Sequence, residues 1–251
     1  MPTALKIAIA GTGRMGKAVE ESALAQGHKI IERFNRNNPV TESALRCSPD
    51  VVIDFTQPEA AIPNFTHYCT TKTPAVMGTT GWYDQLPDVH DLINRCNGAV
   101  LYSSNFSLGI QIILEALKVV APLLDRLPEF DVAVHESHHS AKLDSPSGTA
   151  ISIAQTLTER IQRKHAWSDS ATSPYDSTQL DVVATRLGYV FGQHRIIIDG
   201  PADHLIIEHT AKSRAGFALG AVRAAEWLQG RTGVFTMKDM LAEWLTTNRD
   251  Y

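Results

Sequence analysis

Near the start of the chain the sequence reads Lys6-Ile7-Ala8-Ile9-Ala10-Gly11-Thr12-Gly13-Arg14-Met15-Gly16, a short apolar run that ends in three spaced glycines. The apolar run predicts a buried strand, and the pattern from Lys17 to Gln26 predicts a helix. Glycines at this spacing between a strand and a helix are typical of a dinucleotide site, because they permit a tight turn, a close pyrophosphate and a closely packed helix. The alternative is a glycine turn with a structural role only. We expect the cofactor-binding loop to comprise Gly11, Thr12, Gly13, Arg14 and Met15.

The end of the next strand bears on the choice of cofactor. We predict this strand over Lys29 to Phe34, and a dinucleotide site of this kind normally has an acidic residue there to bind the ribose 2′-hydroxyl. The place is held by Asn35, followed by Arg36. A neutral side chain beside a cation accommodates a 2′-phosphate, so the sequence favours NADPH over NADH, with Asn35 and Arg36 in the site. If the strand ends earlier, Glu32 takes the acidic position instead.

Three further strands with their turns are expected at 50–56, 75–81 and 99–107, separated by helices. Strands that alternate with helices predict a parallel, doubly wound sheet of the Rossmann type, which binds ligands at the carboxyl ends of its strands. The alternative is that each of these loops contains small residues only because a tight turn requires them. The further cofactor-binding candidates are Gly78, Thr79, Thr80, Ser104, Asn105 and Phe106.

The pattern changes after a long helix predicted over 108–127. We expect a strand at 131–134, a helix from Ser147 to about His165, and strands near 182–189, 193–198 and 204–211. Consecutive strands predict a second, α+β domain with an open mixed sheet. The segment 168–179 is rich in Ser and Thr and predicts a surface loop. A helix over 217–228 and the tail after it should pack back on the first domain. We therefore predict a dinucleotide-binding domain of residues 1–106 and 217–251, and a second domain of residues 107–216.

The densest group of chemically active residues follows the strand that carries Val134. The chain there reads Glu136-Ser137-His138-His139-Ser140-Ala141-Lys142-Leu143-Asp144-Ser145-Pro146-Ser147-Gly148-Thr149. A histidine can give a proton at neutral pH, and a lysine can hold negative charge or act as a second donor. Ser145 suits a helix cap and Pro146 the first turn, which would direct the amides near Gly148 and Thr149 toward a carboxylate.

Two other interpretations of this segment remain. Adjacent histidines occur on solvated loops, and Lys142 with Asp144 could form an exposed polar turn. A metal site is disfavoured, because no cysteine or third histidine lies at a zinc spacing and the lysine repels a cation. We predict no metal.

Composition bounds the partners and the compartment. The 251 residues are 43% hydrophobic and 20% charged, with a net charge of −4, which gives no electrostatic reason to bind nucleic acid or an anionic membrane. The sequence shows no signal-peptide pattern and no bilayer-spanning apolar run, so we expect a cytoplasmic protein. Cys47, Cys69 and Cys96 are odd in number and far apart, so we expect them to be reduced.

Together these motifs resemble one family, the 4-hydroxy-tetrahydrodipicolinate reductases, also called dihydrodipicolinate reductases. The resemblance covers nearly the whole chain, and the run from Glu136 to Thr149 is highly specific to that family. Besides that run and the glycine loop, it rests on Asp54-Phe55-Thr56, Gly78-Thr79-Thr80-Gly81, Ser104-Asn105-Phe106-Ser107 and Phe217-Ala218-Leu219-Gly220-Ala221.

The resemblance implies the NADPH- or NADH-dependent reduction of a cyclic imine dicarboxylate, 4-hydroxy-tetrahydrodipicolinate, to tetrahydrodipicolinate in lysine and diaminopimelate biosynthesis. It implies that His138 donates the proton, that Lys142 is the second catalytic donor, and that His139 contacts the substrate. Gly148 and Thr149 would bind a substrate carboxylate, and the second domain would build a homotetramer through its sheet. Two alternatives stay open: another Rossmann oxidoreductase that acts on an amino or keto acid, and a non-catalytic dinucleotide sensor.

Overall fold

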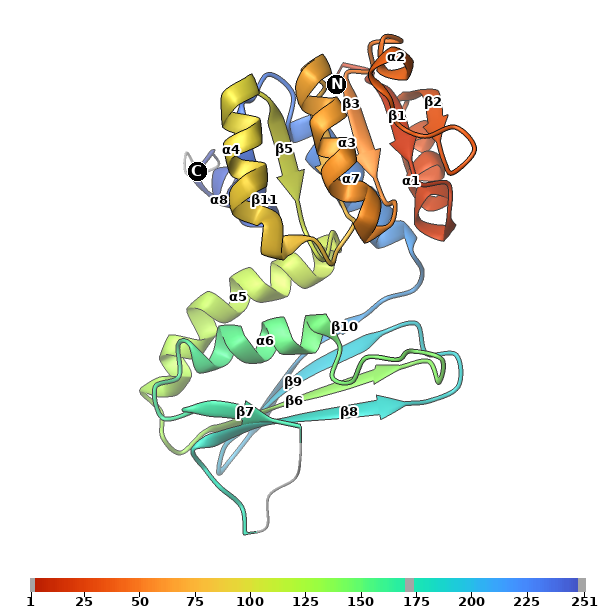
Figure 1. The fold of residues 1–251 in the computed structure, drawn as a ribbon. Helices are drawn as coiled ribbons and strands as arrows, with labels where there is room; N and C mark the ends of the chain where they lie inside the picture. The colour runs from red at the N-terminus through yellow and green to blue at the C-terminus, as the bar shows by residue number, and fades with distance from the viewer. Residues whose placement is uncertain (1–2, 170–173, 248–251) are drawn as a thin grey trace. The chain divides into compact units, whose positions relative to one another are not determined.

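The chain forms two compact units. The computed structural model describes residues 3–169 and 174–247. Met1–Leu108 and Arg214–Tyr251 form the first unit, and Gly109–Ser213 form the second. The chain therefore enters the second unit once and then returns to complete the first (Figure 1).

The first unit is built on a six-stranded sheet in which all neighbouring strands run parallel. The order across the sheet is β11-β5-β4-β3-β1-β2. Parallel neighbours need crossover connections, and helices on both faces supply them here. The predicted doubly wound parallel sheet is confirmed. Its strands are β1 (Lys6–Ala10), β2 (Lys29–Phe34), β3 (Val51–Asp54), β4 (Ala75–Met77), β5 (Ala99–Tyr102) and β11 (Gly233–Thr236).

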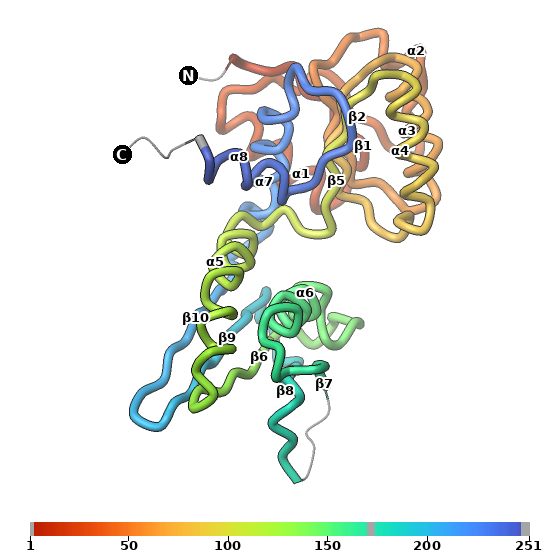
Figure 2. Tube along the Cα trace, turned by 90° about the vertical axis from the view of Figure 1, so that its left-hand side faces the viewer, coloured from red at the N-terminus to blue at the C-terminus, as the bar shows by residue number. Residues whose placement is uncertain are grey.

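Alternate residues of each central strand supply two separate cores. In β1, Ile7 and Ile9 pack with residues of α1, α7 and α8, whereas Ala8 and Ala10 pack with residues of α3 and α4. Figure 2 shows α3 and α4 on one side of this sheet and α7 and α8 on the other. Burial on both faces explains why β1 is a continuous apolar run. The helices are α1 (Arg14–Ala25), α2 (Glu42–Leu45), α3 (Pro58–Thr71), the 3-10 turn η1 (Tyr83–Gln85), α4 (Leu86–Cys96), α7 (Ala215–Trp227) and α8 (Met237–Thr247).

The C-terminal tail completes the sheet of the first unit. Strand β11 pairs parallel with β5, with Gly233 opposite Ala99 and Thr236 opposite Tyr102. The expectation that the tail packs back on the first domain is confirmed, and the sixth strand that it adds was not predicted.

The expectation of three reduced cysteines is wrong for two of them. Cys69 of α3 and Cys96 of α4 form a disulfide, with their Cα atoms 5.7 Å apart, whereas Cys47 is free and exposed. The 27 residues between the bonded cysteines made them look distant in the sequence. Because α3 and α4 pack against each other in one layer, their cysteines meet in space.

The second unit is a five-stranded mixed sheet with two helices on one face (Figure 1). The order is β10-β9-β6-β8-β7, in which β6 runs parallel to β8 and antiparallel to β9. Val132 and Val134 of β6 face the helices and form the core with them. The predicted α+β unit with an open mixed sheet is confirmed. Its elements are α5 (Leu108–Asp125), β6 (Asp131–His138), α6 (Gly148–Thr158), β7 (Ala166–Ser168), β8 (Gln179–Arg186), β9 (Gln193–Asp199) and β10 (His204–Thr210).

Helix α6 is shorter than predicted, because it ends at Thr158 and not near His165. After its last turn, tertiary contacts hold the chain in a non-helical conformation. Arg163 donates to the carbonyls of Leu124 and Phe130, and the Lys164 ammonium lies 2.7 Å from Asp131. The chain then forms β7, whose last residue, Ser168, belongs to the segment expected to be a loop. Of that segment, residues 170–173 lie outside the described part of the chain.

Among the described residues, no helix combines the length and the apolar character needed to cross a bilayer, and this includes the long helix α5.

Candidate active site

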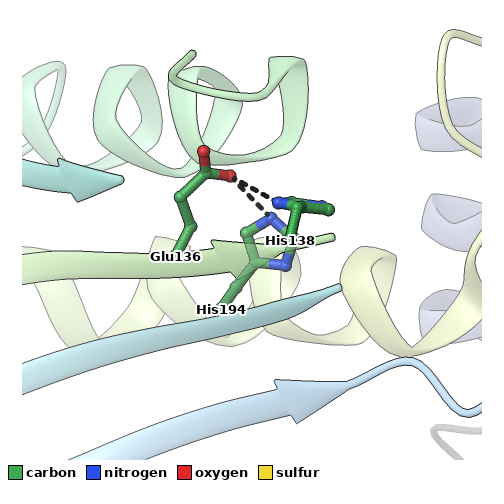
Figure 3. A group of neighbouring side chains, drawn as sticks. All are labelled: Glu136, His138 and His194. Atoms are coloured by element: carbon green, nitrogen blue, oxygen red, sulfur yellow. Dashed lines mark ion pairs between the residues drawn. The ribbon is translucent and has the colours of Figure 1, made fainter. Parts of the chain in front are cut away.

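At the end of β6, the side chains on the buried face of the strand are polar. Side chains alternate between the faces of a strand, so Glu136 and His138 continue the face on which Val132 and Val134 form the core. Both are buried, with 1% and 8% of their surface exposed. His194 of β9 approaches the same point, as Figure 3 shows.

One oxygen of the Glu136 carboxylate accepts two hydrogen bonds, and the other lies close to two imidazoles. Oε1 accepts a hydrogen bond of 2.9 Å from the Ser147 amide and one of 3.1 Å from the Arg186 guanidinium. Oε2 lies 3.2 Å from Nδ1 of His138 and 3.5 Å from Nε2 of His194. Burial alone would raise the pKa of Glu136, but the donors of His138, His194 and Ser147 outweigh it and hold this pKa far below its usual range. Glu136 is therefore a carboxylate fixed beside two imidazoles.

His138 is the last residue of β6, so the strand end holds its backbone. Gly192 lies directly before β9, and a Cβ atom there would lie 3.0 Å from Nε2 of His138. Any side chain at this position would therefore crowd the nitrogen. The prediction that the histidine lies at the end of a strand is confirmed.

Helix α6 begins beside this cluster, but its predicted cap is wrong. Ser147 is the N-cap residue, with Oγ accepting a 3.2 Å hydrogen bond from the Ala150 amide, and the helix starts at Gly148. Ser145 and Pro146 lie before the helix. Because the Ser147 amide donates to Glu136 and its Oγ lies 3.2 Å from Nε2 of His194, the cap is tied to the buried cluster. Gly148 is exposed at the start of the helix, and Thr149 is half-buried.

The loop between β6 and α6 holds His139 and Lys142. The Lys142 ammonium donates to both carboxylate oxygens of Asp144, at 2.7 and 2.9 Å. Burial would raise the pKa of Asp144, but Lys142 and Arg186 lower it below its usual value. The Lys142 amide donates to the carbonyl of His139, which is half-buried. The Lys142–Asp144 pair foreseen as an exposed turn is thus present, beside the cluster around Glu136.

In the first unit, the glycine loop borders a cavity of about 330 Å³. Gly11 has φ +92°, and a Cβ there would lie 2.3 Å from the Phe55 carbonyl, so the turn requires glycine. At Gly13 a Cβ would meet nothing within 4 Å, so the space beside this part of the backbone is open. The predicted residues Gly11, Thr12, Gly13, Asn35 and Arg36 all line this cavity, together with Phe55 and Thr56.

The other predicted cofactor residues lie near the strand ends. Arg14 and Met15 form the first turn of α1, where Met15 packs against the core. Gly78 to Thr80 follow β4, and Ser104 to Phe106 follow β5. The Thr79 and Phe106 side chains are buried, whereas Thr80 and Ser104 are exposed. The Asn105 side chain accepts from the Ser107 amide and shapes its own loop.

Strand β2 ends at Phe34, as predicted, and Asn35 opens a tight turn. Its Oδ1 accepts the amides of Asn37 and Asn38, at 2.8 and 3.1 Å. Arg36 is exposed, and no described residue forms an ion pair with it. The neighbouring cation Arg33 is already paired with Glu20. Arg36 is therefore the available positive charge at this end of the cavity.

Asp54, at the end of β3, is fully buried and joins the loops of the first unit. Oδ1 accepts from the Thr56 amide at 2.9 Å, its hydroxyl at 2.6 Å and the Thr79 hydroxyl at 3.3 Å. Oδ2 accepts from Asn64 and Tyr68, each at 2.8 Å. Five donors compensate the buried charge, and the loops after β3 and β4 share one anchor.

Comparison with known families matches both units to models of the same family. The family model described as the dihydrodipicolinate reductase N-terminus matches residues 5–106, and the one described as its C-terminus matches residues 109–241. The chain belongs to the dihydrodipicolinate reductase family. A 4-hydroxy-tetrahydrodipicolinate reductase of Christiangramia forsetii is 39% identical over 95% of this chain and 98% of its own length. One from Archaeoglobus fulgidus is 33% identical over 94% of this chain and 100% of its own length.

A solved structure supports the fold of this dihydrodipicolinate reductase family member. The dipicolinate-bound dihydrodipicolinate reductase of Paenisporosarcina sp. TG-14 has a TM-score of 0.77 and 19% sequence identity, over 93% of this chain and 98% of that one. The predicted family is confirmed.

The cluster around Glu136 also has the spacing of a metal site. One ligand atom each of Glu136, His138 and His194 lie within 4.8 Å of one another. The sequence argument from spacing missed this, because His194 comes from a different strand. The electrostatic argument remains, since Arg186 donates to Glu136 and a buried divalent cation would face this guanidinium. We keep the prediction that no metal binds here.

Three residues of this cluster were not among the predicted site residues: Glu136, Arg186 and His194. Arg186 lies opposite His138 and His194 lies opposite Glu136 in the register of the sheet. Glu136 had a usable signal, because it stands two residues before His138 on a strand and must share its face. For Arg186 and His194 the sequence offered no such signal, because only the pairing of the strands brings them to this cluster.

Proposed function

We propose that this protein reduces 4-hydroxy-tetrahydrodipicolinate, a cyclic imine dicarboxylate, with NADPH or NADH. The observation that carries this proposal is the buried His138, which has the Glu136 carboxylate beside Nδ1 and Gly192, a residue without a side chain, beside Nε2. It stands beside the start of α6, where helix amides and the helix dipole favour a carboxylate. Family membership supplies the substrate, and the cluster supplies an acid suited to it.

Each residue has a role in this proposal. His138 donates the proton, since an imidazole can do so near neutral pH. Lys142 is the second donor and holds a substrate carboxylate, which would replace Asp144 as its anionic partner. His139, Gly148 and Thr149 contact the substrate, with the start of α6 receiving a carboxylate.

The cavity of the first unit supports the proposal of a dinucleotide site. The glycine loop leaves space beside the backbone for a pyrophosphate, and the loops after β3, β4 and β5 surround the carboxyl ends of the strands. When bound, the nicotinamide supplies the hydride. Arg36 offers a charge for a 2′-phosphate, and Asn35 offers no carboxylate for a 2′-hydroxyl, so we propose NADPH as the better cofactor.

We also propose a homotetramer built through the sheet of the second unit. The face of this sheet opposite α5 and α6 has no helix over it among the described residues. Val183 and Ile206 are 46% and 47% exposed there. Exposed apolar side chains on a flat sheet are typical of a contact between subunits.

A coupled assay tests the reaction. The substrate is generated in place from pyruvate and aspartate semialdehyde by the preceding enzyme, and the loss of NADPH or NADH absorbance is followed for the wild type and for His138→Gln. We expect rapid oxidation by the wild type and a fall in kcat of about 10²- to 10⁴-fold in the variant, the usual contribution of a general acid. Retained nucleotide binding without any oxidation would contradict the proposal.

A further inference from the structure

The two ring nitrogens of His138 have different surroundings. Nδ1 lies 3.2 Å from Oε2 of Glu136, at ion-pair distance, and both atoms are buried without a well-formed hydrogen bond among the described residues. Nε2 lies beside Gly192, which carries no side chain, and a Cβ there would crowd it at 3.0 Å. A neutral imidazole carries one proton, so whichever nitrogen holds it decides which nitrogen can accept the next one. The two nitrogens thus have different neighbours: a carboxylate lies beside Nδ1, and a glycine lies beside Nε2.

Glu136 is positioned to act on Nδ1 of His138 through its charge. Its Oε1 is occupied by the Ser147 amide and Arg186, so the carboxylate cannot rotate without losing both contacts. Its Oε2 is left for the imidazoles (Figure 3). An anion at this distance stabilises a proton on Nδ1.

We propose that Glu136 is the positioning residue of His138: it keeps a proton on Nδ1 and stabilises the imidazolium, so that Nε2 delivers the transferred proton. In that step the Nε2–H bond breaks, its electron pair stays on Nε2, and the proton passes to the reduced substrate. The neutral imidazole that remains keeps its Nδ1 proton toward Glu136, and Nε2 takes the next proton from solvent. The proposal rests on the function of His138 proposed above.

Among the described residues, Glu136 is the carboxylate at ion-pair distance from His138. His194 shares Oε2 at 3.5 Å, with its ring centre 5.2 Å from that of His138, and His209 lies beyond it. Removal of the carboxylate charge would leave the imidazolium among cations and other imidazoles, so protonation of His138 should become harder. The charged and titratable groups around His138 are Glu136 of β6, Arg186 of β8, His194 of β9, His209 of β10, and the paired Lys142 and Asp144 of the loop.

The first test needs no turnover. Isotope-labelled histidine in the full-length wild type reports, by NMR, the pKa of His138 and which nitrogen is protonated in the neutral ring. We expect the proton on Nδ1. Observation of the neutral ring with its proton on Nε2 would overturn the proposal, whether or not any variant folds.

The second test is Glu136→Gln, which keeps the shape and removes the charge. The donor must be protonated, so kcat falls as pH rises through its pKa. In the variant we expect maximal kcat to fall at least tenfold and the decline to begin at lower pH, with a matching fall in the His138 pKa by NMR. Glu136→Asp, which keeps the charge, should recover part of the shift. A lower kcat with an unchanged pH profile and unchanged NMR titration would reduce Glu136 to a structural role and overturn the proposal.

The two proposals fail in distinguishable ways. Full activity in His138→Gln would refute the donor function of His138, and with it the role of Glu136 in catalysis. A slow His138→Gln with an unaltered Glu136→Gln profile would refute the positioning role alone. Gly192→Ala is a matched perturbation beside Nε2. It places a methyl group 3.0 Å from Nε2 and should lower kcat, while the Nδ1 proton stays in place.

Discussion

Two buried carboxylates, one in each unit, show how the neighbours of a residue decide what it can do. Asp54 accepts from hydroxyl and amide groups that do not titrate near neutral pH, so it can fix loops but cannot exchange a proton with them. Glu136 faces the imidazoles of His138 and His194, side chains that can donate or accept a proton. The same chemical group is therefore a structural anchor in one unit and, in our proposal, the partner of a proton donor in the other.

At Asn35 we predict a change of cofactor preference. Asn35→Asp keeps an oxygen where Oδ1 accepts the amides of Asn37 and Asn38, so the turn should persist. The new carboxylate can accept from a ribose 2′-hydroxyl and repels a 2′-phosphate. We expect the NADH-to-NADPH ratio of kcat/KM to rise about tenfold, which corresponds to roughly 1.4 kcal/mol.

Steady-state kinetics with both cofactors measures this ratio. The matched control is Asn37→Asp, which introduces the same charge on the same exposed turn without replacing the side chain that follows β2. An equal shift in both variants would show a general effect of charge, and an unchanged ratio in Asn35→Asp would mean that residue 35 does not meet the ribose.

The sequence predicted individual site residues where the motif was contiguous. His138, Lys142 and Gly148 stand within eleven residues, and the glycine loop stands within six, so local patterns could reveal them. The position of Asn35 directly after β2 followed from the predicted end of that strand. Arg186 and His194 escaped notice because strand register, which no local pattern gives, brings them to Glu136.

At the scale of elements, the start of α6 shows how a local pattern can mislead. Ser145-Pro146 has the composition of a cap and first turn, yet Ser147 caps the helix. The difference is tertiary, because the Ser147 amide is held by Glu136 and its hydroxyl reaches both Ala150 and His194. The buried cluster therefore selects which serine begins the helix.

We predict that Ser147→Ala destabilises the protein. Loss of the side chain that accepts the Ala150 amide should lower the free energy of unfolding by about 1 kcal/mol, the usual cost of a lost cap. Ser152→Ala is the matched control, since the Ser152 hydroxyl donates to the Gly148 carbonyl within the same helix and alanine is favoured in helix interiors. Urea denaturation measures both. Equal stability of the two variants would show that Ser147 is not the effective cap.

At the scale of the whole molecule, the alternation of strands and helices predicted the parallel sheet, and the change to consecutive strands predicted the mixed one. Two features lay beyond this reasoning. Strand β11 joins β5 across 130 intervening residues, and the disulfide joins two helices that pack against each other on one face of the sheet. Both depend on long-range contacts that follow from the complete topology.

The proposed assembly gives a prediction for the whole molecule. Ile206 lies opposite Ile197 on the open face of the second sheet, whereas its neighbour Leu205 lies opposite Ile198, which belongs to the core face. Ile206→Glu places a charge in the proposed subunit contact, where an unpaired buried charge is costly, so we expect the tetramer to dissociate into smaller species.

Leu205→Glu is the matched control. Leu205 is 52% exposed, close to the 47% of Ile206, and stands one residue away on the opposite face, so the same charge there should leave the tetramer intact. Light scattering coupled to size-exclusion chromatography measures the mass of each variant at equal concentration. Because a closed symmetric oligomer repeats each contact, one substitution acts on every copy of the interface. A tetramer that survives Ile206→Glu, or a wild type that is monomeric at micromolar concentration, would rule out this face as the interface.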